Sequence, residues 1–341
     1  VFDFVKIFRV NKSISIDLGT ANILIYDKQR KKIVLNEPSV VARDRKTGRL
    51  IAVGKEAREM LGKTPDSIQA IKPLQDGVIA DIDSTKEMIT YFIHKIYGNS
   101  LFKPEVMICV PIEVTSVERK ALFDAVKGAK KTYIIEEGRA AIIGSGVDIS
   151  QPEGSMVIDI GGGSTDIAIL SLDEIIASKS IRIAGNRFDE DIVRYVKRKY
   201  NLLIGDRTAE KIKKDLGSAL KVQSPEVMEI KGRDLETGIP NTVEVNANEI
   251  YEAIEDSLFQ IVNSTKEVLE KCPPELAADI LDNGIVMTGG GSLIRNFIDM
   301  MEKEVGIKVF LSPNPLDSVV LGGGAAFDNK KLLRTLQMKE N

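Results

Sequence analysis

The chain has 341 residues, of which 43% are hydrophobic and 28% charged, so it is long enough for two globular domains. Its formal net charge of −3 gives no electrostatic reason to expect nucleic acid as a partner. The chain has two distant cysteines and one histidine, so we expect no disulfide framework, zinc site or Ser-His-Asp triad. Cys109 lies in an apolar run and is interpreted as a core residue, and His94 as a structural one.

The first ten residues read V-F-D-F-V-K-I-F-R-V. As a helix they would carry Asp3, Lys6 and Arg9 on one narrow face, with apolar side chains covering the rest. The segment is far shorter than the ~18 apolar residues of a membrane span, so we predict that it lies in the bilayer interface. The anchoring side chains would be Phe2, Phe4, Ile7 and Phe8. A β-strand leading into the first sheet, or a helix docked on the core, is the alternative.

The next motif occurs twice, with its aspartates 159 − 17 = 142 positions apart. The copies read Ile16-Asp17-Leu18-Gly19-Thr20 and Ile158-Asp159-Ile160-Gly161-Gly162-Gly163-Ser164-Thr165. Each copy runs from an apolar strand through an acid and a glycine turn into a second strand, which predicts a β-hairpin. The backbone N–H groups of a glycine turn can bind an anion. Because carboxylates repel phosphate, the two acids would act through a cation such as Mg²⁺ with its waters.

Apolar strands and amphipathic helices alternate along the chain, which predicts an α/β fold. We predict helices over residues 84–97, 115–127 and 247–271, the second opened by a Thr115–Glu118 capping box. A strand-rich insert (33–73) and a helix-rich insert (181–245) interrupt the two halves at equivalent places. We therefore predict two large lobes, each with a small inserted subdomain, and a cleft between them. The first lobe would comprise 1–32, 74–150 and 312–341, and the second 151–180 and 246–311.

A third glycine turn, Thr288-Gly289-Gly290-Gly291-Ser292, follows a predicted strand over 284–287. We expect it to run into a helix over 292–303, whose first N–H groups would face a bound anion. None of the three turns contains a P-loop or a dinucleotide fingerprint. Residues 140–146 and 321–326 are rich in small side chains, which predicts closely crossing helices that could act as hinges between the lobes.

These turns and small-residue helices together resemble the actin, sugar-kinase and heat-shock-chaperone ATPase superfamily. More closely, essentially the whole chain resembles the MreB family of bacterial actin homologues. The stretches specific to that family include Asn36-Glu37-Pro38-Ser39-Val40, Asp76-Gly77-Val78-Ile79-Ala80-Asp81, Asn201-Leu202-Leu203-Ile204-Gly205 and Pro273-Pro274-Glu275-Leu276. The resemblance implies a duplicated, two-lobed actin-like ATPase fold with ATP and Mg²⁺ in the cleft.

Site residues follow from the resemblance residue by residue. Asp17 and Asp159 would hold the waters of the metal, while Glu210 and Lys213 would flank the ribose and base. On spacing alone, however, Glu210 and Lys213 are an ordinary i,i+3 surface pair. The nucleotide-binding set would comprise Gly19, Thr20, Ala21, Asn22, Gly161, Gly162, Gly163, Ser164, Gly185, Asp189, Glu210, Lys213, Gly289, Gly290, Gly291 and Ser292.

The catalytic set implied by the resemblance is Glu137, Ser164 and Asp159, with Glu137 positioning the attacking water. In this family a proline usually follows that glutamate and a methionine comes next, whereas this chain has Gly138 and Arg139. Glycine removes the backbone constraints of proline, so we expect Glu137 to be less well fixed. ATP binding should therefore be ordinary and hydrolysis slow.

The resemblance further implies a cytoplasmic bacterial protein that polymerises with itself into paired protofilaments and controls cell shape. Its filaments would associate peripherally with the inner face of the cell membrane, through the N-terminal segment and through Leu101 and Phe102 in the loop 99–104. Wall-synthesis or membrane scaffold proteins are further expected partners. A small-molecule kinase is one alternative, although no acceptor base other than Glu137 is evident. A chaperone-type ATPase module is the other, although the chain leaves no room for a peptide-binding domain.

Overall fold

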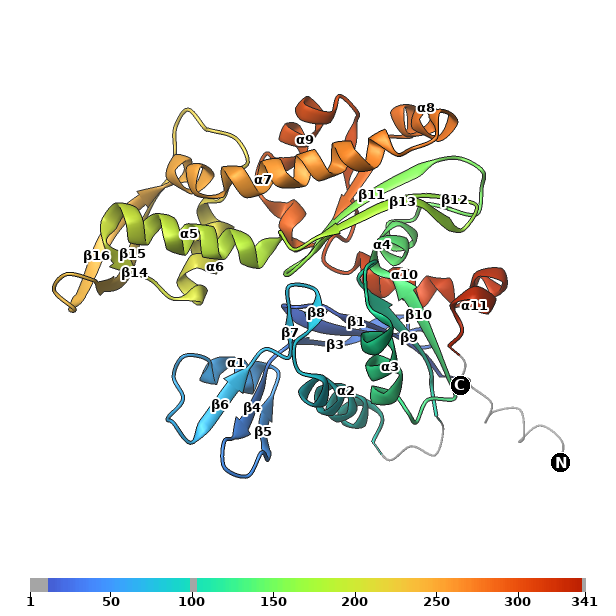
Figure 1. Cartoon of the computed structure of the whole chain (residues 1–341), viewed down its shortest axis with the longest axis horizontal. Helices are drawn as coiled ribbons and strands as arrows, with labels where there is room; N and C mark the ends of the chain where they lie inside the picture. Colours follow the sequence, from blue (N-terminus) through green and yellow to red (C-terminus); the bar gives the residue numbers. More distant parts are fainter. Residues whose placement is uncertain (1–11, 99–102, 339–341) are drawn as a thin grey trace. The chain divides into compact units, whose positions relative to one another are not determined.

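The computed structural model describes residues 12–98 and 103–338, which fall in two compact units (Figure 1). Unit 1 comprises Val1–Gly146 and Asp317–Asn341, and unit 2 comprises Val147–Leu316. The chain leaves unit 1 after Gly146 and returns to it at Asp317. None of the helices among the described residues is long and apolar enough to cross a membrane.

Unit 1 is built on a five-stranded mixed sheet. Its neighbouring strands are, in order, β10 (Lys131–Glu136), β9 (Glu105–Val110), β1 (Ser13–Leu18), β2 (Asn22–Asp27) and β3 (Lys32–Pro38). The three strands β1, β2 and β3 are antiparallel neighbours, and β1, β9 and β10 are parallel neighbours. The hairpin β1–β2 pairs Leu18 with Ile23, which confirms the first predicted hairpin.

Helices cover both faces of this sheet, because side chains alternate along each strand. On one face Ile14 and Ile16 share a buried core with Phe92 of α2 (Ile82–Tyr97) and Leu122 of α3 (Ser116–Ala125). On the other face α4 (Glu137–Gly144) and α10 (Ser318–Ala326) cross each other, and α10 packs on β1, β2 and β9. A Cβ on Gly323 of α10 would lie 2.2 Å from Ser15 Oγ, so glycine permits this close approach. The last helix, α11 (Lys330–Leu336), packs against β10.

A smaller three-stranded sheet follows β3. It is formed by β5 (Leu50–Val53), β4 (Val41–Asp44) and β6 (Ile68–Ile71), with α1 (Lys55–Met60) packed on it. A short hairpin of β7 (Leu74–Gln75) and β8 (Val78–Ile79) then leads to α2. Since β3 pairs with β2 along its length, the start of the insert at residue 33 is wrong, and the small sheet begins at Val41.

Unit 2 contains a second five-stranded sheet with the same topology. Its order is β13 (Glu174–Ile181), β12 (Thr165–Ser171), β11 (Ser155–Ile160), β17 (Ile285–Thr288) and β18 (Val309–Leu311). Again the first three strands are antiparallel neighbours and the last three are parallel neighbours. Hairpin β11–β12 pairs Ile160 with Thr165, so the second predicted hairpin is also confirmed. The sequence duplication is therefore a duplication of sheet topology.

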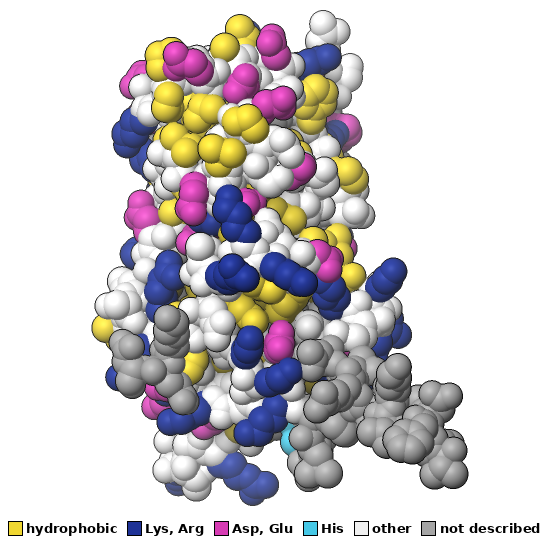
Figure 2. Space-filling model, turned by 90° about the vertical axis from the view of Figure 1, so that its right-hand side faces the viewer, with side chains coloured by type: hydrophobic (Ala, Val, Ile, Leu, Met, Phe, Trp, Pro, Cys, Tyr) yellow, Lys and Arg dark blue, Asp and Glu magenta, His cyan; other side chains and the backbone are white. Residues whose placement is uncertain are grey.

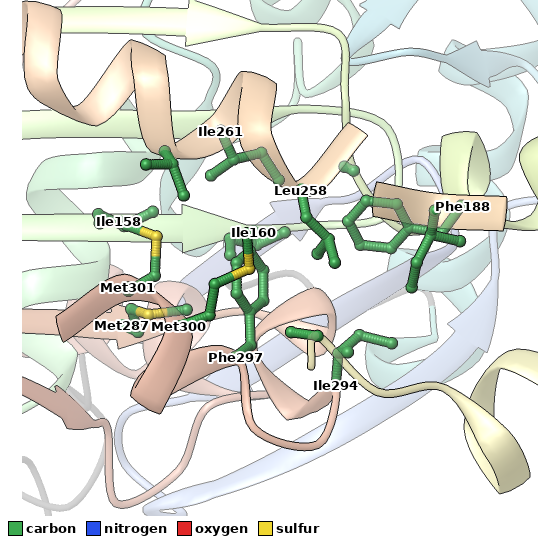
Figure 3. Close-up of a cluster of buried hydrophobic side chains, with 14 of the residues drawn as sticks. Ile158, Ile160, Phe188, Leu258, Ile261, Met287, Ile294, Phe297, Met300 and Met301 are labelled. Atoms are coloured by element: carbon green, nitrogen blue, oxygen red, sulfur yellow. The ribbon is translucent and has the colours of Figure 1, made fainter. Parts of the chain in front are cut away.

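Five α-helices accompany this sheet among the described residues of unit 2. They are α5 (Gly185–Tyr200), α6 (Asp206–Leu216), α7 (Ala247–Glu270), α8 (Pro274–Asn283) and α9 (Phe297–Val305). Phe188 of α5, Leu258 and Ile261 of α7 and Phe297 of α9 meet Ile160 of β11 in one buried core (Figure 3). The insert also holds a small sheet of β14 (Leu202–Leu203), β15 (Val227–Asp234) and β16 (Pro240–Asn246).

The helices predicted from capping and periodicity are confirmed to within two residues at each end. Thr115 and Glu118 form the expected reciprocal capping box of α3. The prediction of a helix running directly from the third glycine turn over 292–303 is wrong. A short 3₁₀ turn, Gly290–Leu293, follows Gly289, and α9 begins only at Phe297 after Asn296 adopts left-handed backbone.

Candidate nucleotide-binding site

The first hairpin tip, residues 19–21, is held by two segments that lie outside the hairpin. Ser39 Oγ donates to the carbonyl of Gly19 at 2.6 Å, and Ser39 N–H donates to the carbonyl of Ala21 at 3.0 Å. Gly77 N–H donates to Thr20 Oγ1 at 3.1 Å. Because that bond uses Thr20 Oγ1 as an acceptor, the hydroxyl proton of Thr20 can be donated to another group. Gly19 itself needs to be glycine, since a Cβ there would lie 2.7 Å from the carbonyl oxygen of Asn22.

Gly77 belongs to a tight turn that connects β7 to β8. Asp76 and Gly77 both have positive φ, 50° and 76°, as a two-residue hairpin turn requires. Just beyond it, the Ile79 N–H donates to Glu118 Oε1 of α3 at 3.2 Å. The first tip is thus joined by hydrogen bonds to the β7–β8 hairpin, and that hairpin to the start of α3.

The second hairpin tip, residues 161–164, is held from within its own unit by the start of α5. Gly185 N–H donates to the Gly161 carbonyl at 3.1 Å, and Asn186 N–H to the Gly162 carbonyl at 2.8 Å. The tip closes with a bond from Gly161 N–H to the Ser164 carbonyl at 2.9 Å. Within residues 12–98 and 103–338 no acceptor is bound by the N–H of Gly162 or Gly163. Successive N–H groups of this kind, next to a helix N-terminus, form an anion-binding concavity.

Beside this tip, Lys213 of α6 joins two of the other predicted residues. Its ammonium contacts Asp189 at 2.9 Å and donates to the carbonyl of Gly185 at 2.8 Å. Burial raises the pKa of Asp189 to about 6, although Lys213 acts in the opposite direction. Glu210 accepts instead from Lys214 at 2.7 Å. Gly161, Gly185, Asp189 and Lys213 therefore lie together in unit 2, and the Glu210 side chain is paired along its own helix.

The two aspartates of the repeated motif occupy equivalent strands. Asp17 is the second-to-last residue of β1 in unit 1, and its pKa is raised to about 7, chiefly by burial and then by the Asp317 carboxylate. Asp159 lies on β11 in unit 2 and is buried. Aspartate oxygens are suitable partners for Mg²⁺ and its waters, so the residues present fit that ion. Among the described residues no group of three or more His, Cys, Asp or Glu side chains could hold a metal by itself.

The third glycine turn packs directly on the second hairpin. Gly289 has φ 81°, and a Cβ there would lie 2.3 Å from the Ile160 carbonyl oxygen and 2.6 Å from Asp159 Oδ1. Its N–H donates to the carbonyl of Pro315 at 2.9 Å. Ser292 Oγ donates to the carbonyl of Gly289 at 2.6 Å and is buried, so this hydroxyl closes the turn. Gly290 is exposed, whereas Gly289 and Gly291 are buried against β11.

The predicted catalytic glutamate is the first residue of α4. Glu137 is buried, and Gly138 is a buried residue of the same helix, so the loose backbone expected at Gly138 is not observed. Arg139 is also buried, with its Nε 3.1 Å from Glu136 Oε2. The cation at this position is therefore paired with the residue before Glu137.

The two small-residue helices meet each other inside unit 1. A Cβ on Gly144 of α4 would lie 1.8 Å from the Ser318 carbonyl oxygen, and one on Gly322 of α10 would lie 1.8 Å from that of Ala140. The predicted close crossing is confirmed. The chain leaves unit 1 just after α4 and returns to it just before α10, which is where a hinge between the units would lie. The hinge role itself stays a prediction.

Sequence reasoning missed several residues that support the site. Ser39 and Gly77 hold the first tip, Asn186 holds the second, and Asp317 raises the pKa of Asp17. Asp76-Gly77 is a recognisable hairpin turn, but nothing in the sequence said which loop it would contact. Ser39 and Gly77 both lie in stretches already singled out for their family resemblance.

Comparison with known proteins agrees with the hairpin geometry. A family model described as MreB/Mbl protein matches residues 11–335. The chain belongs to the MreB/Mbl family. It is 49% identical over 321 residues to the cell shape-determining protein Mbl of Bacillus subtilis (strain 168), covering 93% of this chain and 96% of that protein. It is 47% identical over 326 residues to the cell shape-determining protein MreB of Escherichia coli (strain K12), with coverage of 93% and 94%.

Among solved structures, MreB5 of Spiroplasma citri bound to AMPPNP superposes with a TM-score of 0.89 at 39% identity. The match covers 95% of this chain and 98% of that one, and MreB5 has also been solved bound to ADP. The predicted family and the two-lobed actin-like fold of this MreB/Mbl member are thus confirmed. The individual site residues stay predictions. The six predicted membrane residues, Phe2, Phe4, Ile7, Phe8, Leu101 and Phe102, lie outside the described part of the chain.

Proposed function

We propose that this MreB/Mbl protein binds ATP with Mg²⁺, hydrolyses it slowly, and polymerises into filaments at the inner face of a bacterial membrane, where they control cell shape. The observation that carries the proposal is the pair of topologically equivalent hairpins, each with a glycine tip and an aspartate. Two similarities support it: MreB5 is bound to AMPPNP and to ADP in its crystal structures, and the Mbl and MreB relatives are named cell shape-determining proteins.

Phosphate oxygens would be recognised mainly by backbone. The Gly162 and Gly163 N–H groups, and the N-terminal end of the α5 dipole, favour a negative charge at the second tip. The first tip would add the Thr20 hydroxyl, whose oxygen already accepts from Gly77. These donors suit a polyanion and not a particular sugar or base, so preference for adenine would come from other residues.

The carboxylates have a separate task. Asp17 and Asp159 would hold the waters of a Mg²⁺ ion, which when bound neutralises phosphate charge. Glu137 would orient the attacking water and accept its proton. Because Glu137 is buried and begins a helix, its backbone is fixed by α4, and slow hydrolysis would have to arise from its chemical surroundings and not from loose backbone.

Two rival functions are disfavoured by family membership. A small-molecule kinase would need a general base that accepts the proton of an acceptor hydroxyl. Among the described residues we identify no candidate for that base other than Glu137. A chaperone ATPase is a different branch of the same superfamily, whereas nearly the whole chain matches MreB/Mbl.

Membrane association and polymerisation support each other. A buried large apolar side chain contributes roughly 1.5–3 kcal/mol, so one monomer would be held weakly. A filament presents many such anchors at once, and the combined attachment becomes effective. Self-assembly would therefore decide when the protein is on the membrane.

Sedimentation of the full chain with Mg²⁺ and ATP, ADP or no nucleotide tests the proposal. We expect ATP to give the largest pelleted fraction, and Asp159→Ala to remove that dependence. Asp256→Ala is the matched control, because Asp256 is an exposed carboxylate on α7 in the same unit. A soluble monomer under all nucleotide conditions would contradict the proposal, as would unchanged nucleotide dependence in Asp159→Ala.

A further inference from the structure

Chain segments that are far apart in sequence meet at one edge of the unit 1 sheet, the edge where the strands β1, β9 and β10 begin. The strands β1, β9 and β10 are parallel, so their first residues lie at the same edge. There Glu105 N–H donates to the Lys12 carbonyl at 2.7 Å, and Lys130 N–H donates to the Pro104 carbonyl at 2.8 Å. Lys28 N–H donates to the Ser13 carbonyl at 3.0 Å, so the β2–β3 turn reaches this edge as well.

This edge is rich in exposed lysine. Lys31 ends the β2–β3 turn and Lys32 begins β3, while Lys103 lies just before β9. Lys127 lies in the connection from α3 to β10, and Lys131 begins β10. We call these five residues the basic edge. None of them has a carboxylate partner among the described residues. The lower part of Figure 2, over unit 1, shows Lys and Arg side chains gathered on this side of the molecule.

The carboxylates near the basic edge are buried or already paired. Asp27 is 3% exposed and accepts from the Tyr97 hydroxyl at 2.9 Å. Glu105 pairs with Lys130 at 3.4 Å, and Asp328 pairs with Lys28 at 2.6 Å. The positive charge of the five lysines is therefore not cancelled locally. On a chain whose net charge is −3, it is confined to one side.

Both predicted apolar anchors join the folded unit at this edge. Lys12 directly follows residues 1–11, and Lys103 directly follows residues 99–102. Tyr97, the last residue of α2, comes two positions before the second segment, and the Lys12 ammonium lies 5.1 Å from its ring centre. The two points of attachment are thus in contact, within reach of the basic edge.

We propose that the basic edge binds the anionic headgroups of a lipid bilayer. This inference rests on the proposed membrane association and adds its chemical basis: the folded unit itself is a recognition surface, in addition to the apolar segments. An anionic bilayer presents both a negatively charged surface and an apolar interior, which matches lysines next to two apolar segments. Nucleic acid would match the lysines alone, and the acidic chain as a whole would be repelled from it.

The expected strength follows from the number of lysines. A lysine close to an anionic leaflet strengthens binding about five-fold, and this attraction decays within about one Debye length, ~8 Å at physiological salt. Removing three of the five charges should therefore weaken binding by about 10- to 100-fold, and added salt should weaken wild-type binding in the same way.

The test compares two triple variants in vesicle co-sedimentation. The edge variant is Lys31→Gln, Lys32→Gln, Lys131→Gln. The control variant is Lys46→Gln, Lys55→Gln, Lys63→Gln, which removes three exposed lysines of the small-sheet region, on the other side of unit 1 in Figure 1. Both remove the same charge from exposed positions of one unit. Vesicles contain equal parts phosphatidylglycerol and phosphatidylcholine, or phosphatidylcholine alone, and ATP-dependent pelleting without vesicles checks that assembly is intact.

We expect wild type and control variant to bind the anionic vesicles alike, and the edge variant to bind 10- to 100-fold more weakly with assembly unchanged. Equal binding by edge and control variants would overturn the inference and leave membrane association standing. Failure of wild type to bind either vesicle would contradict the proposed membrane association itself. Binding of wild type to duplex DNA as tightly as to anionic vesicles, lost in the edge variant, would reassign the surface to nucleic acid.

Discussion

The two hairpins share strand order and register, but they are supported in different ways. The second tip is held by backbone from α5 of its own unit. The first tip is held by a side chain, Ser39, and by Gly77 in a separate small hairpin that in turn contacts α3. Duplicated strands have therefore kept the acid and the glycine turn, while the surrounding support differs.

A second difference concerns the strand next to each hairpin. In unit 2, β17 ends at Thr288 and is followed by Gly289, whose backbone packs on Ile160 and Asp159. The equivalent β9 in unit 1 ends at Val110 and continues into Pro111, without a glycine turn. The second hairpin therefore packs against a glycine turn from its neighbouring strand, whereas the first hairpin is supported by Ser39 and Gly77 instead.

The largest expected effect is on hydrolysis, at a residue that belongs to neither hairpin. Glu137→Ala should lower single-turnover hydrolysis by about 10²–10⁴-fold, the usual contribution of a positioned base, with nucleotide affinity nearly unchanged. Glu113→Ala, at an exposed position in the same unit, is the control. Unchanged hydrolysis in Glu137→Ala would remove this residue from the catalytic set.

Asp159→Ala in the second hairpin should reduce Mg²⁺-dependent turnover by about 10²–10³-fold, as loss of one preorganised electrostatic group does in other enzymes. Steady-state turnover at several Mg²⁺ concentrations measures it, with circular dichroism to show that the protein stays folded. Wild-type turnover in a folded Asp159→Ala protein would contradict the assignment.

The packing of the third glycine turn can be tested with two left-handed glycines of unit 2. At Gly306, which has φ 71° and open space around its Cβ position, alanine should cost about 1–2 kcal/mol in the free energy of unfolding. At Gly289 the contacts with Ile160 and Asp159 should add about 1–3 kcal/mol from overpacking. Denaturant unfolding of Gly289→Ala and Gly306→Ala measures both. Equal losses would mean that the turn can move away from the second hairpin.

The smallest expected effect concerns the support of the first tip. Ser39→Ala removes a buried bond to the Gly19 carbonyl and should cost about 1–3 kcal/mol in stability. Ser171→Ala removes a similar buried bond, from Ser171 Oγ to the Pro152 carbonyl at 3.0 Å, away from both tips. Stability should fall in both variants, but ATP affinity should fall only in Ser39→Ala. Loss of affinity in both would mean a general destabilisation and no specific support of the tip.

The sequence allowed the fold class, both hairpins and the main helices to be predicted, because each depends on local signals. The capping box at Thr115 and the apolar spacing of 247–271 are examples. The prediction of a helix over 292–303 was wrong, because Asn296 has left-handed backbone and α9 begins only after it. An asparagine in this conformation has no unique signature in the local sequence. The prediction also placed β3 in the insert, whereas β3 forms a hairpin with β2 across the short turn 28–31. Apolar residues predict a strand there but do not say to which sheet the strand belongs.

Within the site, the glycines and acids could be predicted from the repeat, but their supports could not. Ser39 and Gly77 contact a tip that is 20 and 57 positions away in sequence. The looseness expected at Gly138 was inferred from what proline would impose locally. Instead, Gly138 is a buried residue of the helix α4, and α4 crosses α10 closely at Gly144.

The proposed function requires that both hairpins bind the same nucleotide. Calorimetric titration with a non-hydrolysable ATP analogue and Mg²⁺ tests it most directly, using wild type, Thr20→Val in the first tip and Ser164→Ala in the second. We predict one analogue bound per chain, and weaker binding in each variant by about ten-fold or more, since a hydrogen bond to a charged group contributes roughly 1.5–3 kcal/mol. Two analogues bound per chain, or unchanged affinity in either variant, would contradict the claim.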